Sequence, residues 1–375
     1  MPSLPKPDQD ALAHSGRLLG LIRKNILDSR GWISFAEYMR LALYAPGLGY
    51  YSAGAAKFGA AGDFVTAPEI SSLFGQTLAR FASEWLARNP DTDILELGAG
   101  TGKLAFDLLS DLEIPCRNYF ILEVSADLKA RQEKRLQGFA VTWLEKLPEH
   151  FDGLIIANEV LDAVPFNVVC WNEDGIAERG VCLREGNPDW CDRPLPEGPL
   201  LDAARAIRVP PGYVSEIQME ARALVKNLAG MLDRGMLLFI DYGFGRNEYY
   251  HPQRDHGTLM CHYRHHAHDD PFMLPGLQDI TTHIDFSAVL EAGIDSGLQF
   301  LGYTSQAHFL INCGIVDILG RVSPENTATY LPLCSELQKL ISPAEMGELF
   351  KVMGFCKETA TISSCFSLGD RSRLL

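Results

Sequence analysis

Short apolar segments alternate with amphipathic stretches between residues 93 and 158 of the chain. The apolar segments have the length and composition of buried strands: DILELG (93–98), YFILEV (119–124), AVTWLE (140–145) and GLIIAN (153–158). The stretches TGKLAFDLL and SADLKARQEKRL lie between strands and have apolar residues at helical spacing. Strands that alternate with helices favour a mostly parallel sheet with right-handed crossovers, so the predicted fold class is α/β.

The chain before residue 90 has a different pattern, in which helices flank a long loop. Apolar positions at helical spacing predict a helix over residues 8–29, and SFAE (34–37) has the capping-box pattern that opens a second helix. The segment GLGYYSAGAAKFGAAGDFVTAPE (47–69) is too rich in glycine and alanine for a stable regular element. TAPE (66–69) then predicts another helix start. We expect residues 1–90 to form a helical N-terminal region whose long loop is a lid over substrate or cofactor.

Beyond residue 158 the alternation continues with two interruptions. Strand patterns recur at 236–243, 298–303 and 352–357, and helix patterns occur at 214–233 and from Asp285 onward. The runs FNVVCW (166–171) and IAERGVCLRE (176–185) predict an added hairpin, followed by a proline-rich excursion to about residue 200. We therefore expect residues 91–375 to form one Rossmann-like domain, with insertions at 166–213 and 244–285.

Composition narrows the class of protein. A net charge of −15 disfavours nucleic-acid binding, which needs clustered Lys and Arg to displace counterions from phosphates. The nine cysteines are scattered without a CxxC pair, which favours reduced thiols over a disulfide framework. No segment approaches the roughly 18 apolar residues of a membrane helix, and the first residues lack the pattern of an export signal. We expect a cytoplasmic protein without membrane insertion.

A glycine-rich turn, GAGTG, joins the first strand of the alternating series to the following helix. Its glycines, Gly98, Gly100 and Gly102, let the backbone approach a ligand without interference from a Cβ atom. Glu123 ends the next strand, where a carboxylate can accept hydrogen bonds from both hydroxyls of a ribose. A lysine at position 103 breaks the GxGxxG spacing that binds a dinucleotide pyrophosphate, and this disfavours a nicotinamide-dependent oxidoreductase.

The stretch ELGAGTG (96–102) resembles motif I, (E/D)xGxGxG, of class I S-adenosylmethionine-dependent methyltransferases. The resemblance implies that Glu96 faces the amino-acid end of the cofactor and that Glu123 binds its ribose. Members of this superfamily often have an Asp beside the adenine where this chain has Trp143, followed by Leu144. This departure leaves stacking or a backbone contact as ways to bind the adenine. Both residues are equally compatible with plain core packing.

Polar residues follow the strand at 153–158, at the sheet edge where ligands of open α/β proteins collect. Methyl transfer from a sulfonium is an in-line displacement, so positioning and removal of water supply most of the rate. A carboxylate can bind a guanidinium, localise its charge and aim one nitrogen at the methyl group. Glu159 is the first candidate for this role and Asp162 the second, with Asn158 expected beside the cofactor. The alternative is a solvated polar strand exit. Further candidates for contacts to the substrate or to a lid are Asp63, Thr66 and Glu69.

Five ordered segments resemble the MidA family of class I methyltransferases: GDFVTAPEIS (62–71), ELGAGTG (96–102), ANEVLDAVPF (157–166), FIDYGF (239–244) and PGLQDITTHIDF (275–286). The resemblance implies a methyltransferase fold, S-adenosylmethionine as cofactor and a protein-arginine substrate. It also implies a respiratory complex I subunit as a possible partner, because mitochondrial relatives are arginine methyltransferases that assist complex I assembly. Better-known arginine methyltransferases use two glutamates in a longer loop, whereas here the acids are Glu159 and Asp162, so a two-carboxylate clamp stays open.

Two other functions remain compatible with these residues. One is a small-molecule methyltransferase of the same fold, which the glycines and Glu123 do not distinguish from a protein methyltransferase. The other is an assembly factor that keeps the cofactor fold while its essential role is docking onto a partner subunit. Identification of the methylated side chain separates the first from the main hypothesis, and rescue by an inactive variant separates the second.

The segment CHYRHHAHDD (261–270) places four histidines within ten positions. Only His262 and His266 have i, i+4 spacing, and the HExxH context of a zinc site is absent. We therefore expect no bound metal. The segment follows FIDYGF in the chain, so it belongs to a long connection at the predicted rim of the active site. Its histidines and Tyr263 are candidates to order a substrate-facing loop or to stack on a peptide, and for most of the histidines we expect structural hydrogen bonding instead.

Overall fold

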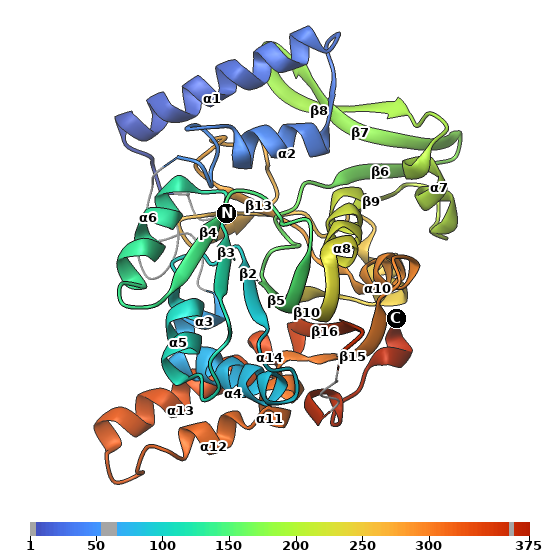
Figure 1. Ribbon diagram of the computed structural model, residues 1–375. Helices are drawn as coiled ribbons and strands as arrows, with labels where there is room; N and C mark the ends of the chain where they lie inside the picture. Colours follow the sequence, from blue (N-terminus) through green and yellow to red (C-terminus); the bar gives the residue numbers. More distant parts are fainter. Residues whose placement is uncertain (1–4, 54–65, 360–363) are drawn as a thin grey trace. The chain divides into compact units, whose positions relative to one another are not determined.

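This computed structural model contains a mostly parallel sheet (Figure 1). The structure describes residues 5–53, 66–359 and 364–375. The strands of the sheet are β2 (Asp93–Leu97), β3 (Tyr119–Leu122), β4 (Val141–Leu144), β5 (Phe151–Asn158), β10 (Leu232–Phe244), β15 (Gln299–Ser305) and β16 (Phe350–Lys357). Their order is β15-β16-β10-β5-β2-β3-β4. Neighbours from β10 to β4 are parallel, and β16 is antiparallel to both β10 and β15. The predicted α/β fold class is confirmed.

The chain divides into two compact units, which we call the accessory unit and the sheet unit. The accessory unit takes the described parts of Met1–Phe64 together with Asp162–Ala223 and Arg246–Asp285. The sheet unit takes the described parts of Val65–Leu161, Leu224–Gly245 and Phe286–Leu375. The expected domain division between residues 90 and 91 stays a prediction, because compactness does not say which pieces fold alone.

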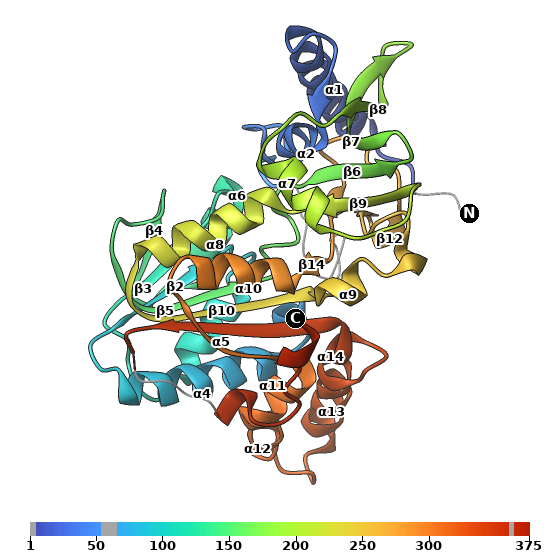
Figure 2. The same cartoon turned by 90° about the vertical axis from the view of Figure 1, so that its right-hand side faces the viewer.

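Helices cover both faces of the sheet and bury its apolar strands. On one face lie α4 (Ser72–Arg88) and α5 (Lys103–Asp111), and on the other lie α8 (Met219–Met231) and α10 (Phe286–Asp295) (Figure 2). The core on the α4 face contains Trp85, Ile94, Ile156 and Leu238, all of them fully buried. Burial of a side chain of this size contributes about 1.5–3 kcal/mol, which explains why the central strands are apolar on both faces.

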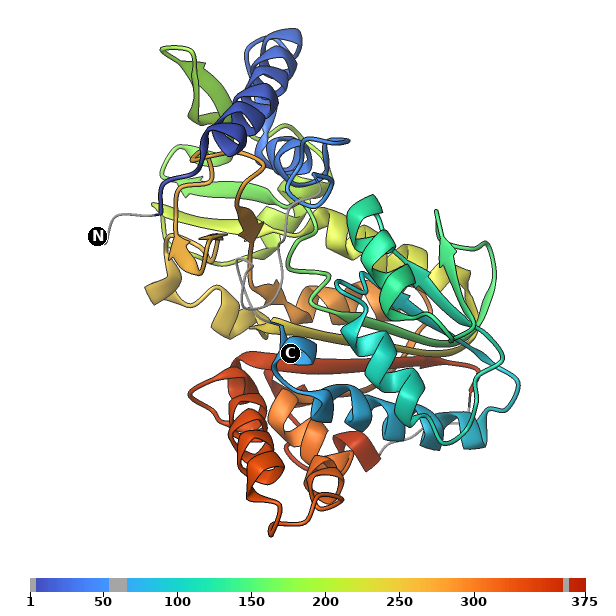
Figure 3. The ribbon, with the colours of Figure 1, turned by 90° about the vertical axis from the view of Figure 1, so that its left-hand side faces the viewer.

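A group of helices near the C-terminus extends the core on the α4 side of the sheet (Figures 2 and 3). These helices are α11 (Gln306–Asn312), α12 (Ile315–Leu319), α13 (Thr327–Ile341) and α14 (Met346–Leu349). Phe309 of α11 meets Phe81 of α4 edge to face, with ring centroids 5.5 Å apart. The sheet unit also contains the short helix α3 (Ala67–Ile70) and α6 (Ala126–Arg135). No helix in the described ranges is long and apolar enough to cross a membrane.

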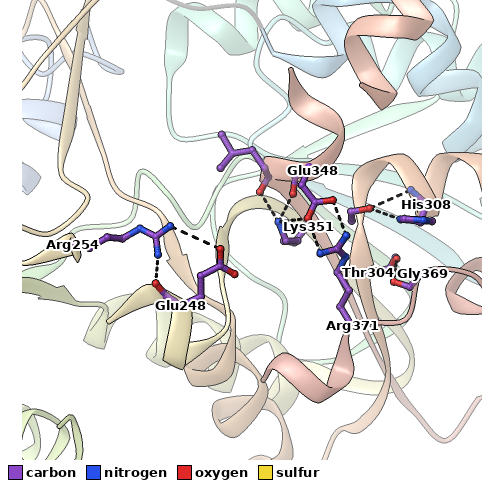
Figure 4. A network of polar contacts seen from close by, with 10 residues as sticks. Glu248, Arg254, Thr304, His308, Glu348, Lys351, Gly369 and Arg371 are labelled. Atoms are coloured by element: carbon purple, nitrogen blue, oxygen red, sulfur yellow. Dashed lines mark hydrogen bonds and ion pairs between the residues drawn. The ribbon is translucent and has the colours of Figure 1, made fainter. Parts of the chain in front are cut away.

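The last residues of the sheet unit are anchored by a polar network (Figure 4). Arg371 forms a two-pronged ion pair with Glu348, in which Nη1 lies 2.6 Å from Oε1 and Nη2 lies 2.7 Å from Oε2. The Arg371 backbone N–H donates to Tyr303 O at 2.8 Å, and Thr304 Oγ1 donates to Gly369 O at 2.8 Å. These contacts hold the segment from 364 onward against the edge strand β15.

The accessory unit combines helices with small antiparallel sheets. Its helices are α1 (Gln9–Asp28), α2 (Phe35–Tyr44), α7 (Pro199–Ala206) and α9 (Arg246–Tyr249). Its strands are β1 (Ile33–Ser34), β6 (Asn167–Asn172), β7 (Gly175–Arg184), β8 (Asn187–Pro194), β9 (Tyr213–Ile217), β11 (Met260–Tyr263), β12 (His266–His268), β13 (Asp279–Thr281) and β14 (Ile284–Asp285). The first sheet has the order β1-β7-β6-β9, with β8 also paired to β7. Ile22, Phe35, Phe166 and Val181 form its apolar core with α1 and α2.

Most predicted elements are confirmed, and three predictions are wrong in detail. The predicted helix 214–233 begins only at Met219, because residues 213–217 pair with β6 as strand β9. The proline-rich excursion contains β8, which pairs with β7. The single helix predicted from residue 66 is interrupted at Ser71, whose extended backbone ends α3 and whose Oγ caps α4 by accepting from Leu73 N. The pairing of β9 is a long-range contact that overrides the local pattern, whereas the β7–β8 pairing and the Ser71 cap are made between residues close in the chain.

Candidate cofactor and active site

The glycine-rich turn leaves β2 with three residues in left-handed conformations. The φ angles are +62° at Gly98, +54° at Gly100 and +78° at Gly102. A Cβ atom at Gly98 would lie 3.3 Å from Val160 Cγ2, and one at Gly102 would lie 3.2 Å from Gln132 Cγ. A Cβ atom at Gly100 would meet no protein atom within 4 Å among the described residues. Gly100 therefore faces open space, where a ligand can approach the backbone.

Glu96 lies on β2 beneath this turn and is fully buried. Tyr119 on the neighbouring strand β3 donates its hydroxyl hydrogen to Glu96 Oε2 at 2.6 Å. Burial raises the pKa of Glu96 to about 7, the Tyr119 hydrogen bond opposes this rise, and the charge of Glu123 adds to it. A buried carboxyl with a pKa near neutrality is a common feature of functional sites. A cationic ligand beside Glu96 would stabilise its ionised form.

Glu123 follows β3 and is held on both carboxylate oxygens. Ser125 N donates to Oε1 at 2.9 Å, and Gln132 Nε2 donates to Oε2 at 2.8 Å. Gln132 Nε2 also donates to Gly100 O at 2.9 Å, so one amide joins the acid to the glycine turn. Hydrogen bonds to a carboxylate fix its direction and favour its ionised form. The arrangement presents Glu123 as a fixed acceptor.

Trp143 and Leu144 lie on β4, opposite Ile121 and Leu122 of β3. Trp143 Nε1 donates to Gln132 Oε1 at 2.9 Å. The indole N–H thus contacts the same glutamine that binds Glu123, and the side chain is only partly buried. Leu144 is also partly buried. Contact of either residue with an adenine stays a prediction.

Glu159 comes directly after β5 and has a left-handed backbone, with φ +51°. Its N–H donates to Ile240 O of β10 at 2.8 Å, which holds the turn to the sheet. Its Oε1 accepts hydrogen bonds from Ala67 N at 3.3 Å and from Asn158 Nδ2 at 3.4 Å. Asn158 Oδ1 is buried and has no hydrogen-bond partner in the described part of the chain. Asn158 and Glu159 therefore place polar groups at the carboxyl edge of the parallel strands.

Helix α3 contacts both Glu159 and the glycine-rich turn. Its first residue, Ala67, contacts Glu159, and its Glu69 accepts a hydrogen bond from Thr101 Oγ1 in the turn. Arg135 of α6 donates to Thr101 Oγ1 at 2.5 Å and lies 3.6 Å from Glu69 Oε1. Thr66 occupies the N-cap position without a side-chain cap within the described ranges. Asp63 lies outside the described residues.

Asp162, the second candidate acid, belongs to the accessory unit. It is buried, and its backbone O accepts a hydrogen bond from Thr282 N at 3.2 Å. The pKa of Tyr51 is raised mainly by burial, then by Asp279 and Tyr44, and the charge of Asp162 makes a smaller contribution in the same direction. The structure thus assigns Glu159 and Asp162 to different units, and a joint clamp made by the two acids stays a prediction.

The histidine-rich segment forms a hairpin. Cys261, His262 and Tyr263 of β11 pair with β12 through a two-residue turn. The turn residues Arg264 and His265 have φ angles of +46° and +63°, which is typical of tight hairpin turns. Within the described residues, no group of three or more His, Cys, Asp or Glu side chains is placed to hold a metal ion.

Sequence reasoning missed three residues of this site: Tyr119, Gln132 and Arg135. Tyr119 fits the pattern of a buried strand, and Gln132 and Arg135 fit the pattern of a charged helix. Their presence in the sequence is therefore explained without any contact to a ligand. Burial of Gln132 inside a helix with mostly charged neighbours is the one signal that sets it apart, and only the structure shows it.

The site fits a nucleoside cofactor with an amino-acid tail. Such a ligand has ribose hydroxyls and an ammonium group, which are hydrogen-bond donors, and Glu96, Glu123 and Asn158 Oδ1 are acceptors. Gly100 provides the open backbone approach. Lys103, which follows the turn, is paired with Asp107. The acceptor-rich set fits a cationic ligand better than a phosphate.

Comparison with known proteins defines the class. Residues 77–304 match the family described as "Putative S-adenosyl-L-methionine-dependent methyltransferase". The chain belongs to this family, known as MidA, and S-adenosylmethionine is its cofactor.

Similar proteins include a crystal structure from Burkholderia thailandensis, described as a "likely methyl transferase" bound to S-adenosyl-homocysteine. It is 48% identical, covers 100% of both chains and has a TM-score of 0.96. "Protein arginine methyltransferase NDUFAF7, mitochondrial" of Danio rerio is 31% identical over 86% of this chain and 82% of its own length. The Drosophila melanogaster homologue of that protein is 29% identical over 94% of this chain and 88% of its own length.

Proposed function

We propose that this methyltransferase modifies arginine side chains of a partner protein and that Glu159 binds the guanidinium. The observation that carries the proposal is the backbone of Glu159, which is left-handed at the end of β5. A left-handed non-glycine residue costs of order 1–3 kcal/mol and tends to occur at functional sites. The strained turn places an acid at the sheet edge where ligands of this fold class bind.

For this reaction the chain must bind the cofactor, position the guanidinium and accept a proton. S-adenosylmethionine, when bound, supplies a methyl group on an electrophilic sulfonium. Glu123 would accept hydrogen bonds from the ribose and Glu96 would face the ammonium, while Gly100 lets the backbone approach. Glu159 would accept hydrogen bonds from the guanidinium, hold one nitrogen in line with the methyl group and accept the proton that this nitrogen loses. Asn158 and Leu144 are proposed to border the cofactor, as is Trp143.

The acidic groups also explain why arginine can react beside a positive sulfonium. Two cations repel each other strongly in a site from which water is excluded. The Glu159 carboxylate compensates one of these charges, and its contact with Ala67 N keeps it in place. Glu69 and Thr66 of the α3 segment are proposed to close the site on the substrate side. Asp162 remains a second candidate acid.

The names of the relatives support arginine as the target. The Danio rerio and Drosophila melanogaster proteins are both named protein arginine methyltransferases. We extend this substrate class to the present chain, with a respiratory complex I subunit as the partner that the family resemblance implies. We also propose that the chain acts in the cytoplasm.

Replacement of Glu159 by Gln tests the proposal. The amide keeps the size of the side chain but cannot compensate the guanidinium charge, so we expect methyl transfer to fall by about a hundredfold or more. Calorimetry should show S-adenosylmethionine affinity within about twofold of the parent, since the acid contacts the substrate rather than the cofactor. Glu133→Gln, an exposed change on α6, is the control and should leave transfer intact. Unchanged transfer by Glu159→Gln would overturn the assignment.

A further inference from the structure

We propose that Gln132 and Trp143 are positioning residues that hold Glu123 for ribose recognition, so that together they determine how well the protein discriminates a ribose from a deoxyribose. The inference rests on the proposed binding of ribose by Glu123. It is carried by a chain of hydrogen bonds that links β4, α6, the end of β3 and the glycine turn within the sheet unit.

Gln132 has no exposed surface and uses its whole amide group. Nε2 has two hydrogens, and these are directed to Gly100 O at 2.9 Å and Glu123 Oε2 at 2.8 Å. Its methylene groups pack against Gly102, where a Cβ atom would lie 3.2 Å from Gln132 Cγ. The glutamine therefore fixes both the backbone that approaches the cofactor and the acid expected to bind its ribose.

Trp143 helps to fix the orientation of the Gln132 amide, together with Glu123 and the Gly100 carbonyl. An indole N–H can only donate, so the atom of Gln132 that faces Trp143 Nε1 must be the carbonyl oxygen, at 2.9 Å. The amide nitrogen is thereby directed toward Glu123 and Gly100. In the reversed orientation the amide oxygen would face two acceptors, the Glu123 carboxylate and the Gly100 carbonyl, and both hydrogen bonds would be lost.

This network gives a physical role to Trp143, which occupies the position where the superfamily often has an Asp. The side chain on β4 is an indole instead of an acid, and its polar atom is used against Gln132. Trp143 thus acts through Gln132 on the ribose end of the site. A side chain that served core packing alone would affect stability and would not alter selectivity for ribose hydroxyls.

Calorimetric titration with S-adenosyl-homocysteine and its 2′,3′-dideoxy analogue separates these roles. The variants are Gln132→Met, Trp143→Phe and the double variant, with Gln137→Met as an exposed control in the turn that follows α6. Thermal unfolding establishes that each variant is folded. The dideoxy analogue lacks the hydroxyls that Glu123 is proposed to bind, so it reports every contribution to affinity except ribose recognition.

We expect Gln132→Met to weaken binding of S-adenosyl-homocysteine by about tenfold, as the loss of hydrogen bonds to a charged group implies, and to leave binding of the dideoxy analogue nearly unchanged. Trp143→Phe should have the same selectivity with a smaller effect, of about threefold. Because tryptophan acts through glutamine, the double variant should match Gln132→Met alone. Gln137→Met should bind both ligands like the parent.

Two outcomes overturn the proposal in different ways. If Gln132→Met or Trp143→Phe weakens both ligands by the same factor, the residues shape the whole site and do not position the ribose acid. If the parent protein binds both ligands equally, the assignment of Glu123 to the ribose fails, and the role of Gln132 fails with it.

Discussion

Gly100 and Gly102 have similar backbone conformations but different surroundings. Both are left-handed, yet a Cβ atom at Gly102 would press on Gln132, whereas one at Gly100 would have no neighbour within 4 Å among the described residues. A substitution at Gly102 should therefore disturb the protein, and one at Gly100 should disturb the cofactor that we propose to bind there. The two glycines separate the folding requirement of the turn from its binding requirement.

Gly100→Ala should cost about 1–2 kcal/mol in stability, since alanine tolerates a left-handed backbone poorly. It should weaken S-adenosylmethionine binding by more than tenfold, because the Cβ atom enters the space reserved for the cofactor. Gly138→Ala is a matched control, since Gly138 also has a positive φ, +100°, and no neighbour within 4 Å among the described residues. Titration and thermal unfolding of both variants check this. Equal affinities for the two variants would mean that the cofactor does not approach Gly100.

The raised pKa of Glu96 predicts that stability and cofactor binding depend on pH. Its pKa in the folded protein is raised from 4.5 to about 7, chiefly by burial. A group whose pKa is raised in the folded protein contributes its full stability at pH values below the pKa that it has in the unfolded chain. This contribution is lost as the pH rises through the pKa in the folded protein. The cofactor-free protein should therefore lose about 3 kcal/mol of stability from this residue between pH 4.5 and pH 7.

Tyr119→Phe tests this account through the pKa. The Tyr119 hydrogen bond lowers the pKa of Glu96, so its removal should raise that pKa further. The ammonium group of S-adenosylmethionine favours the ionised form of Glu96, so affinity should fall as the pH is lowered and the acid becomes protonated. In Tyr119→Phe this fall should begin at a higher pH than in the parent. Titrations from pH 6 to pH 9 and unfolding curves of Glu96→Gln against the parent supply the two readouts. An identical pH profile for Tyr119→Phe and the parent would contradict the role of this pair.

Among the elements, the four-residue helix α3 contacts both parts of the proposed site. Its backbone contacts Glu159, and its Glu69 contacts Thr101 of the glycine turn and lies near Arg135 of α6. The helix is too short to be stable alone, so these contacts define its position. It connects the acid proposed to bind the substrate with the turn proposed to bind the cofactor.

Glu69→Ala should therefore impair catalysis without unfolding the protein. The pair with Arg135 is partly exposed and contributes little stability, but loss of the contact with Thr101 releases α3. We expect kcat/KM to fall about tenfold, with a change in melting temperature of only a few degrees. Glu84→Ala, which removes an exposed ion pair with Arg88 on α4, serves as control. Equal steady-state kinetics for Glu69→Ala and Glu84→Ala would show that the position of α3 does not affect catalysis.

The elements also show what could be predicted from sequence. The glycine turn and the buried strands carry strong local signals, since strands covered on both faces must be apolar and turns near ligands need glycine. Strand β9 has no such signal, because its pairing with β6 joins residues far apart in the chain. The same holds for Gln132, whose partners lie on β4, after β3 and in the turn. Long-range hydrogen bonds decide these positions, and local patterns do not record them.

At the scale of the whole molecule, the chain forms two units, each built from three separate segments, and we propose that the sheet unit binds the cofactor. The family match over residues 77–304 includes parts of both units and identifies the chain as a methyltransferase, whereas its substrate is a proposal. An assembly factor of the same fold would need the docking surface but not the reaction. Full biological rescue by Glu159→Gln would favour docking, and failure of rescue would favour catalysis.

The central claim is methyl transfer to protein arginine through Glu159. The direct measurement is incubation of the purified chain with S-adenosylmethionine carrying a deuterated methyl group and with protein extract from a strain that lacks the chain, followed by peptide mass spectrometry. The account predicts deuterated methyl groups on arginine with the parent and none with Glu159→Gln. Label found only on lysine or on small molecules, or equal arginine labelling by both proteins, would contradict it.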